Sequence, residues 1–250
     1  MANAFVLAAG DAHGRLAQMA GTNFRALIKV GGRPMVERVL VALRESRRTK
    51  RVALVAPLEV QEELSPELTD VTVTPGATLV DNVMRGLAAL GDGDLVLFAH
   101  ADAPLVTAAA IDDFLERAEP QRPDLAYAIV PKEAVEKAFP RGHRTYAHLR
   151  DGSFTGTNVV LVNAGFIMRH QPLVREFYKH RKNPLRLAGM LGAGFMLRLV
   201  TGRLTIAHLE ERLSQILGGQ ARAIVSAYPG LAFDVDKPAD LDTIREILGD

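Results

Sequence analysis

The sequence predicts an α/β protein with a mostly parallel central sheet and helices on both faces of that sheet. Short, continuous apolar runs alternate with segments of helical periodicity through the first half of the chain. Such runs are typical of strands buried on both faces, and strands that alternate with helices favour parallel pairing. The 250 residues, of which 48% are hydrophobic and 24% charged, are enough to bury a full core.

The elements of the first half follow one another in a regular order. We expect strands at Ala4–Ala9, Arg51–Ala56, Val71–Thr74, Leu95–Ala99 and Leu125–Val130. The segments between them with helical periodicity are Pro34–Ser46, Glu59–Leu64, Thr78–Leu90 and Thr107–Ala118. Pro34 suits a first helical turn, and Thr107 suits an N-cap.

The pattern changes after Pro131. Tyr146–Arg150, Asp151-Gly152-Ser153 and Thr157–Asn163 predict a hairpin with the pair Asp151-Gly152 at its turn. A helical stretch, roughly residues 164–217, follows and is interrupted by Pro172, Pro184 and Gly202. A last strand, Ala221–Ala227, leads through Leu231–Asp236 to a closing helix at Pro238–Leu248.

Composition excludes several classes of protein. Without cysteine there is no disulfide scaffold, thiolate metal site or cysteine nucleophile. A net charge of +1 gives no argument for nucleic acid as a partner. Arg186 and Arg198 interrupt the longest apolar stretch, Leu185–Gly202, so we expect no transmembrane segment. Since Met1–Gly10 has no basic start, we expect no signal peptide and a cytoplasmic location.

A glycine-rich loop follows the first expected strand, which ends in Leu7-Ala8-Ala9-Gly10. It holds Gly10, Gly14, Arg15, Gly21 and Thr22, with Arg25, Lys29 and Arg33 just beyond. Glycines let backbone N–H groups approach an anion, and α/β proteins bind ligands where parallel strands end. The loop predicts a phosphate site, or is a plain glycine-rich connection. Its spacing matches neither a P-loop nor the dinucleotide fingerprint, which argues against a Rossmann dehydrogenase.

Carboxylates stand at two further strand ends. Asp102 follows the strand Leu95–Ala99 and suits Mg²⁺, which takes one or two carboxylates, although it can also cap a turn. Asp234 and Asp236 point to one side of an extended segment, so both can approach a metal. Alternatively, Asp236 caps the closing helix and Asp240 lies in its first turn. His100 is a weaker candidate for a ligand or catalytic group.

The order of these pieces is more specific than any one of them. Leu-Ala-Ala-Gly is followed by Arg25-Ala26-Leu27 with Gly31-Gly32-Arg33-Pro34-Met35, then by Ala101-Asp102-Ala103-Pro104-Leu105, then by Asp234–Leu241. This order resembles the MobA-like NTP transferases, which include molybdenum-cofactor guanylyl- and cytidylyltransferases and are related to sugar-phosphate nucleotidyltransferases. The resemblance extends over residues 1–130 and 221–248.

The resemblance implies a Rossmann-like, GT-A type nucleotide-diphospho-sugar transferase fold with a helical C-terminal insertion. It also implies one nucleotidyltransferase domain, 1–250. Residues 1–130 form the nucleotide-binding half, 131–220 the acceptor hairpin and helical insertion, and 221–250 the closing strand and helix.

The resemblance further assigns roles to individual residues. The expected nucleotide-binding residues are Leu7, Ala8, Ala9, Gly10, Gly14, Arg15, Arg25, Gly76, Asn82 and Asp102. Arg15, Arg25 and Asp102 are expected to be catalytic, and Asp102, Asp234 and Asp236 to hold Mg²⁺. Asn158 lies where related enzymes hold their acceptor. Arg144, in a basic and aromatic patch, suits an anionic acceptor.

The chain departs from the family pattern in two places. Asp11-Ala12-His13 lengthens the glycine loop, and Arg25 stands where the family usually has lysine, whose compact charge is not equivalent to a planar guanidinium. These changes imply either altered nucleotide handling or a degenerate site.

The expected reaction is Mg²⁺-dependent transfer of NMP from an NTP to a phosphorylated small-molecule acceptor, with release of pyrophosphate. A GT-A type glycosyltransferase acting on a nucleotide sugar and a non-catalytic nucleotide-binding protein are the alternatives. The first-strand loop and Arg33-Pro34 favour nucleotidyl transfer.

The helical insertion is basic, with eight Lys/Arg and one acidic residue in 169–203. It suits a lid or homodimer surface, or peripheral contact with an anionic membrane. Gly189, Gly192 and Gly194 favour the lid or dimer, because they favour close helix packing.

Overall fold

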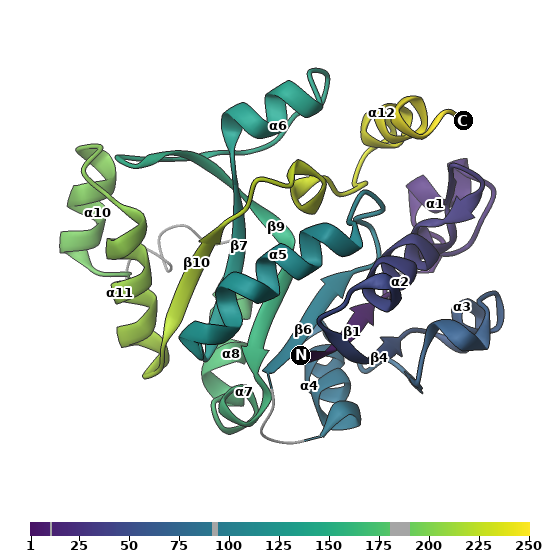
Figure 1. Cartoon of the computed structure of the whole chain (residues 1–250), viewed down its shortest axis with the longest axis horizontal. Coiled ribbons are helices and arrows are strands. Elements are labelled where there is room, and N and C mark those ends of the chain that lie inside the picture. The colour runs from purple at the N-terminus through teal and green to yellow at the C-terminus, as the bar shows by residue number, and fades with distance from the viewer. Residues whose placement is uncertain (11, 92–94, 181–190) are drawn as a thin grey trace.

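A computed structural model describes residues 1–10, 12–91, 95–180 and 191–250. A central sheet runs through the described residues, with helices on both of its faces, and this confirms the predicted fold class (Figure 1). The strand order is β10-β7-β9-β6-β1-β4-β5, and β8 pairs with β9 off that path.

The parallel part of the sheet comes from the first half of the chain. β1 (Ala2–Leu7) pairs in parallel with β4 (Thr49–Val55) on one side and β6 (Leu95–His100) on the other. β5 (Val71–Val73) adds in parallel to β4. The carboxyl ends of β1 and β6 therefore lie side by side, with Leu7 opposite His100.

An antiparallel strand joins the two halves of the sheet. β9 (Gly152–Asn163) runs antiparallel between β6 and β7 (Leu125–Pro131), and β10 (Ala221–Val225) pairs in parallel with β7. The predicted hairpin forms between β8 (Ala147–Leu149) and β9. Because Leu149 pairs with Gly152, the turn lies one residue earlier than expected, and β9 begins well before Thr157.

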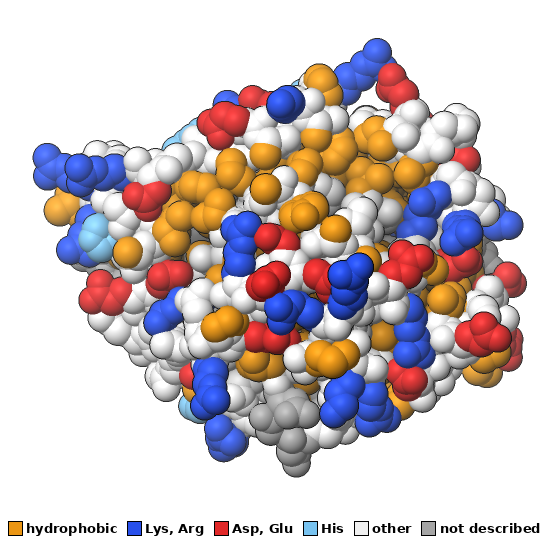
Figure 2. Space-filling view, in the orientation of Figure 1, with side chains coloured by type: hydrophobic (Ala, Val, Ile, Leu, Met, Phe, Trp, Pro, Cys, Tyr) orange, Lys and Arg blue, Asp and Glu red, His pale blue; other side chains and the backbone are white. Residues whose placement is uncertain are grey.

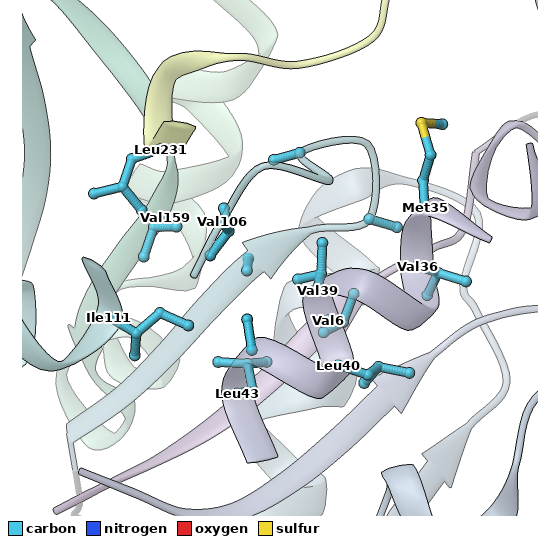
Figure 3. Packing of buried hydrophobic residues seen from close by; sticks show 14 of the residues in the cluster. Val6, Met35, Val36, Val39, Leu40, Leu43, Val106, Ile111, Val159 and Leu231 are labelled. Carbon is cyan, nitrogen blue, oxygen red and sulfur yellow. The ribbon is translucent and has the colours of Figure 1, made fainter. Parts of the chain in front are cut away.

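Alternate residues of β1 face different helices. Ala4 and Val6 belong to the core beneath α2 (Met35–Glu45) and α5 (Ala108–Ala118) (Figure 3). Phe5 and Leu7 belong to the core beneath α4 (Leu79–Leu90) and α7 (Ala164–Arg169). The continuous apolar run is thus explained by burial on both faces.

The expected helices form with small shifts. Thr78 and Thr107 accept backbone N–H bonds as the N-caps of α4 and α5. Pro34 lies just before α2 and not in its first turn. The other α-helices within the described residues are α1 (Arg15–Met19), α3 (Leu58–Glu62), α6 (Lys132–Ala138), α8 (Gln171–His180), α10 (Ala193–Val200), α11 (Ile206–Leu217) and α12 (Pro238–Leu248). Of these, α1 lies in the predicted loop, and α6 was not predicted.

The helical insertion is divided between two places. α7 and α8 lie near α4, whereas α11 packs beside β10 at the opposite end of the sheet from β5 (Figure 1). Pro184 and the first part of the apolar stretch, residues 185–190 with Gly189, lie outside the described residues. In the described ranges, no helix is long and apolar enough to cross a membrane. Acidic and basic side chains intermingle on the face seen in Figure 2.

Candidate functional site

A cavity of about 370 Å³ opens where β1 and β6 end, and we call it the strand-end cavity. Most of the expected nucleotide-binding residues line it, namely Leu7, Ala8, Ala9, Gly10, Arg25, Asn82 and Asp102. His100, Asn158 and Asp234 also lie in its wall. Parallel strand ends thus bring together pieces of sequence that are far apart, as the fold class requires.

Arg25 joins two of the carboxylates expected to bind metal. It begins a short 3₁₀ helix, Arg25–Leu27. Its Nη2 lies 2.6 Å from Oδ2 of Asp102, and its Nη1 lies 2.6 Å from Oδ1 of Asp236. One guanidinium fork therefore gathers carboxylates from the end of β6 and from the segment before α12.

Asp102 is held tightly at the end of β6. Its side chain is 10% exposed, and within the described part of the chain its Oδ1 has no hydrogen-bond partner. Its carbonyl oxygen accepts a hydrogen bond of 2.9 Å from the Val235 N–H, which ties the two acidic segments together. Thr107 caps α5 as predicted. The alternative that Asp102 caps the turn before this helix is not supported, because its Oδ2 contacts Arg25 and its Oδ1 has no partner among the described residues.

The aspartates before α12 have separate roles. The Asp240 carboxylate accepts the N–H groups of Asp236 and Lys237, at 3.2 and 2.9 Å. Asp240 therefore accepts the hydrogen bonds of the backbone N–H groups at the start of α12. The alternative that Asp236 caps this helix is wrong. Burial, and then the charge of Asp236, raise the pKa of Asp234 to about 6.

The carboxylates fit a magnesium ion by their chemistry. Among the residues with described placement, no group of three or more His, Cys, Asp or Glu side chains is arranged to hold a metal. Mg²⁺ needs only one or two protein carboxylates and completes its shell with water and phosphate oxygens. The buried, unpartnered Oδ1 of Asp102, with Asp236 on the same guanidinium, meets that requirement.

The surroundings of His100 favour the neutral form of its imidazole. Burial lowers the pKa of its imidazole, and the opposing charge of Asp102 only partly offsets this effect. Its ring centroid lies 6.2 Å from that of Phe98, on the face of the sheet covered by α4. A neutral imidazole in the cavity wall offers one hydrogen-bond donor and one acceptor to a ligand.

A second cavity of about 400 Å³ adjoins the first, and we call it the hairpin cavity. Asn158 and Asp234 line both cavities, so the two are neighbours. Arg144 and Asp236 also line the hairpin cavity. The expected acceptor residues therefore lie next to the expected nucleotide site.

The guanidinium of Arg144 is largely engaged within the protein. It lies 3.1 Å from Asp240 and donates to the carbonyl oxygens of Ala232 and Asp234. It also stacks 3.9 Å from the ring centroid of Phe233, and its side chain is only 10% exposed. This contact set holds the 232–240 segment in place, and a role in acceptor binding stays a prediction.

Three expected nucleotide-binding residues lie outside the strand-end cavity wall. Arg15 is exposed at the start of α1, and Gly14 precedes it. Gly76 donates its N–H to Oδ1 of Asn82 and so orients a residue that does line the cavity. Ala12 pairs with Phe24, which draws the lengthened loop back toward Arg25, while Asp11 lies outside the described residues.

Sequence reasoning missed Tyr178. This residue of α8 belongs to the helical insertion, yet it lines the strand-end cavity together with residues from the ends of β1 and β6. Only the position of an aromatic residue on an amphipathic helix pointed to it, and core packing gives the same signal.

Comparison with known proteins decides the family. The family model described as "MobA-like NTP transferase domain" matches residues 4–174, which is more than half of the chain. The chain belongs to this family. The matched region of this MobA-like chain includes the first-strand loop, Arg25 and Asp102.

Two relatives of the MobA-like chain share its sequence over less than half of its length. Both are 2-C-methyl-D-erythritol 4-phosphate cytidylyltransferases. The one from Frankia casuarinae is 34% identical over 110 residues, 43% of this chain and 41% of that protein. The one from Streptomyces avermitilis is 31% identical over 126 residues, 46% of this chain and 50% of that protein. The matched region thus spans half or less of these relatives.

Solved structures share the fold over nearly all of the MobA-like chain. A hypothetical transferase from Thermus thermophilus is 39% identical with a TM-score of 0.86, over 96% of this chain and 99% of that one. The 2-C-methyl-D-erythritol 4-phosphate cytidylyltransferase of the same organism has a TM-score of 0.58 at 20% identity, over 100% of both chains. At that identity the second likeness shows the fold alone.

Proposed function

We propose that this chain is a Mg²⁺-dependent nucleotidyltransferase that transfers NMP from an NTP to a phosphorylated small-molecule acceptor. The observation that carries the proposal is the Arg25 fork on Asp102 and Asp236, where the two cavities meet. A cation and paired carboxylates beside a glycine loop form a site for a metal-bound triphosphate.

The cavities separate the two substrates. The backbone of Ala8–Gly10 and the Arg25 guanidinium line the end of the strand-end cavity that suits phosphates. The hairpin cavity, which shares Asn158 and Asp234 with it, suits the acceptor. An acceptor oxygen attacks the α-phosphorus, the bond to the β-phosphate oxygen breaks, and pyrophosphate leaves with the electron pair.

The residues of the chain act by positioning and charge. Arg25 stabilises the growing negative charge on the departing phosphates, and the family resemblance assigns the same role to Arg15, which is exposed at the start of α1. Asn158 orients the acceptor at the junction. Asp102 and Asp236, with Asp234 beside them, would hold Mg²⁺, which would supply Lewis-acid stabilisation of the transferring phosphoryl group.

The relatives support the choice of acceptor. By their names, the two partial relatives transfer cytidylyl to 2-C-methyl-D-erythritol 4-phosphate, a phosphorylated polyol. We therefore place phosphorylated polyols and sugars first among the acceptor classes for this chain.

The test is product analysis with Mg²⁺, each of the four NTPs and a panel of phosphorylated sugars, polyols and cofactor precursors. Pyrophosphate release with one NTP and acceptor pair supports the proposal and names both substrates. Release of a nucleoside diphosphate from a nucleotide sugar instead identifies a glycosyltransferase. NTP binding without turnover on any acceptor identifies a non-catalytic binding protein.

A further inference from the structure

Helix α8 contributes an aromatic side chain to the wall of the strand-end cavity. Tyr178 of this helix lines the cavity together with Leu79 and Asn82 of α4 and His100 of β6. Arg25, Asp102 and the glycine loop line the rest. The cavity wall thus combines charged groups and a glycine loop, which suit phosphates, with an aromatic ring, an aliphatic side chain and the polar side chains of Asn82 and His100.

We propose that Tyr178 contacts the nucleobase and that α8 is a specificity helix, fixed in place by the Arg175–Asp81 ion pair. This inference rests on the proposed nucleotide function and names the part of the site that receives the base. A flat heterocycle needs an aromatic or aliphatic face to stack on and a few fixed polar groups at its edge.

A backbone hydrogen bond fixes the orientation of Asn82 in the cavity wall. Oδ1 of the buried Asn82 accepts the Gly76 N–H at 2.6 Å, which leaves its amide N–H groups as donors. The loop at Gly76 is packed so closely that an added Cβ would come within 2.6 Å of Cβ of Asp81. The His100 ring lies beside the Phe98 ring, with 6.2 Å between their centroids.

Asp81 connects this loop to α8. Its carboxylate accepts the Thr78 N–H at 3.0 Å and the Thr78 hydroxyl at 2.7 Å, which closes the first turn of α4. The same carboxylate lies 2.6 Å from Nη2 of Arg175. Val174 packs against the core beneath α4. Since Arg175 and Tyr178 are three residues apart on one helix, fixing the first orients the second.

The test compares binding of NTP with binding of inorganic tripolyphosphate, which has no base. With Mg²⁺ present, calorimetry on Tyr178→Ala should show at least about tenfold weaker binding of the preferred NTP and unchanged binding of tripolyphosphate. Tyr178→Phe keeps the ring and should retain the affinity of the wild type. Circular dichroism and the melting temperature verify that each variant is folded.

Arg175→Ala and Asp81→Asn test whether the ion pair between Arg175 and Asp81 holds α8 in place. Asparagine can still accept the Thr78 bonds but cannot form the ion pair. Each variant should weaken NTP binding several-fold and leave tripolyphosphate binding unchanged. The double variant should bind NTP no more weakly than either single variant, because both changes remove the same ion pair. Lys179→Ala removes a charge from an exposed position of the same helix and should have no effect.

The outcomes separate this inference from the function on which it rests. Suppose that the wild type binds an NTP. If Tyr178→Ala binds that NTP equally well, or if its affinities for NTP and tripolyphosphate fall by the same factor, the base assignment is wrong while the nucleotide function stands. If the wild type binds tripolyphosphate but discriminates none of the four NTPs from it, both the base site and the proposed substrate are wrong.

Discussion

Nη2 of Arg25 lies 2.6 Å from Oδ2 of Asp102, so the cation that follows the first-strand loop neutralises the carboxylate at the end of β6. The same guanidinium reaches Asp236 at 2.6 Å. Without a ligand, Arg25 supplies the positive charge that two neighbouring carboxylates require. A bound metal and triphosphate would compete for both partners of this contact, which makes each of these residues a direct probe of the site.

Asp102→Asn should abolish most of the turnover. The amide keeps the shape of the side chain but removes the charge that would hold Mg²⁺, so we expect a loss of about 10²-fold or more in kcat. Steady-state assays over a range of Mg²⁺ concentrations measure this effect. Asp242→Asn, at an exposed position of α12, is the matched control. Wild-type turnover and Mg²⁺ dependence in Asp102→Asn would remove this residue from the site.

Arg25→Lys and Arg25→Ala should differ. Lysine restores the residue usual in the family and keeps a charge for the phosphates, so its affinity for NTP should fall by only a few-fold. Alanine should weaken NTP binding by about tenfold or more, since it removes a charge-assisted contact. Calorimetric titration with Mg²⁺ and NTP distinguishes the two. Equal affinities in the alanine variant and the wild type would place the phosphates elsewhere.

Asp234 should make the stability of the fold depend on pH in an unusual direction. Burial raises its pKa from 3.8 to about 6, so the folded state binds this proton more tightly than the unfolded state does. Its contribution is complete below pH 3.8 and is lost as the pH rises through about 6. A shift of this size corresponds to on the order of 3 kcal/mol.

Urea unfolding of the wild type and Asp234→Asn between about pH 4 and 7 measures that contribution. The free energy of unfolding of the wild type should fall relative to that of the variant as the pH rises, and should then level off. A constant difference across the range would mean that Asp234 has an ordinary pKa.

Arg144 should be needed for stability. Arg144→Ala leaves the Asp240 carboxylate, which is 11% exposed, without its cation, and should lower the free energy of unfolding by about 3–5 kcal/mol. Arg141→Ala breaks an exposed pair with Glu246 and should cost less than about 1 kcal/mol. Urea unfolding of both variants makes the comparison. If Arg144→Ala lowered the free energy of unfolding as little as Arg141→Ala, Arg144 would not be needed for stability and would be available to bind the acceptor.

Much of the sheet was predictable because its strands are buried on both faces. Phe5 and Val6 point into different cores, and that requirement appears in the sequence as an unbroken apolar run. The closing helix was predicted at its true bounds, Pro238–Leu248, because proline marks its first turn. The antiparallel strand β9 fits the pattern less well, because its first residues lie at the sheet's rim and are partly exposed.

The charged half of the site was predictable, and the other half was not. Asp102 follows the end of β6, where parallel topology places ligand sites. Arg25 and Asp236, in a 3₁₀ helix and in the segment before α12, were assigned to the same site by the family resemblance. Tyr178 reaches the same cavity only through the tertiary packing of α8 on α4, which local sequence does not encode. The role of Asp240 in place of Asp236 at the start of α12 likewise depended on side-chain orientation.

The most direct test of the account is the Mg²⁺ dependence of NTP binding in the wild type and in Asp102→Asn, measured by calorimetry with Mg²⁺ and with EDTA. We expect the wild type to bind its preferred NTP at least about tenfold more tightly with Mg²⁺, and the variant to show no such difference. Wild-type binding that is the same in EDTA, or a variant that keeps the full Mg²⁺ effect, would contradict a metal-bound triphosphate at Asp102.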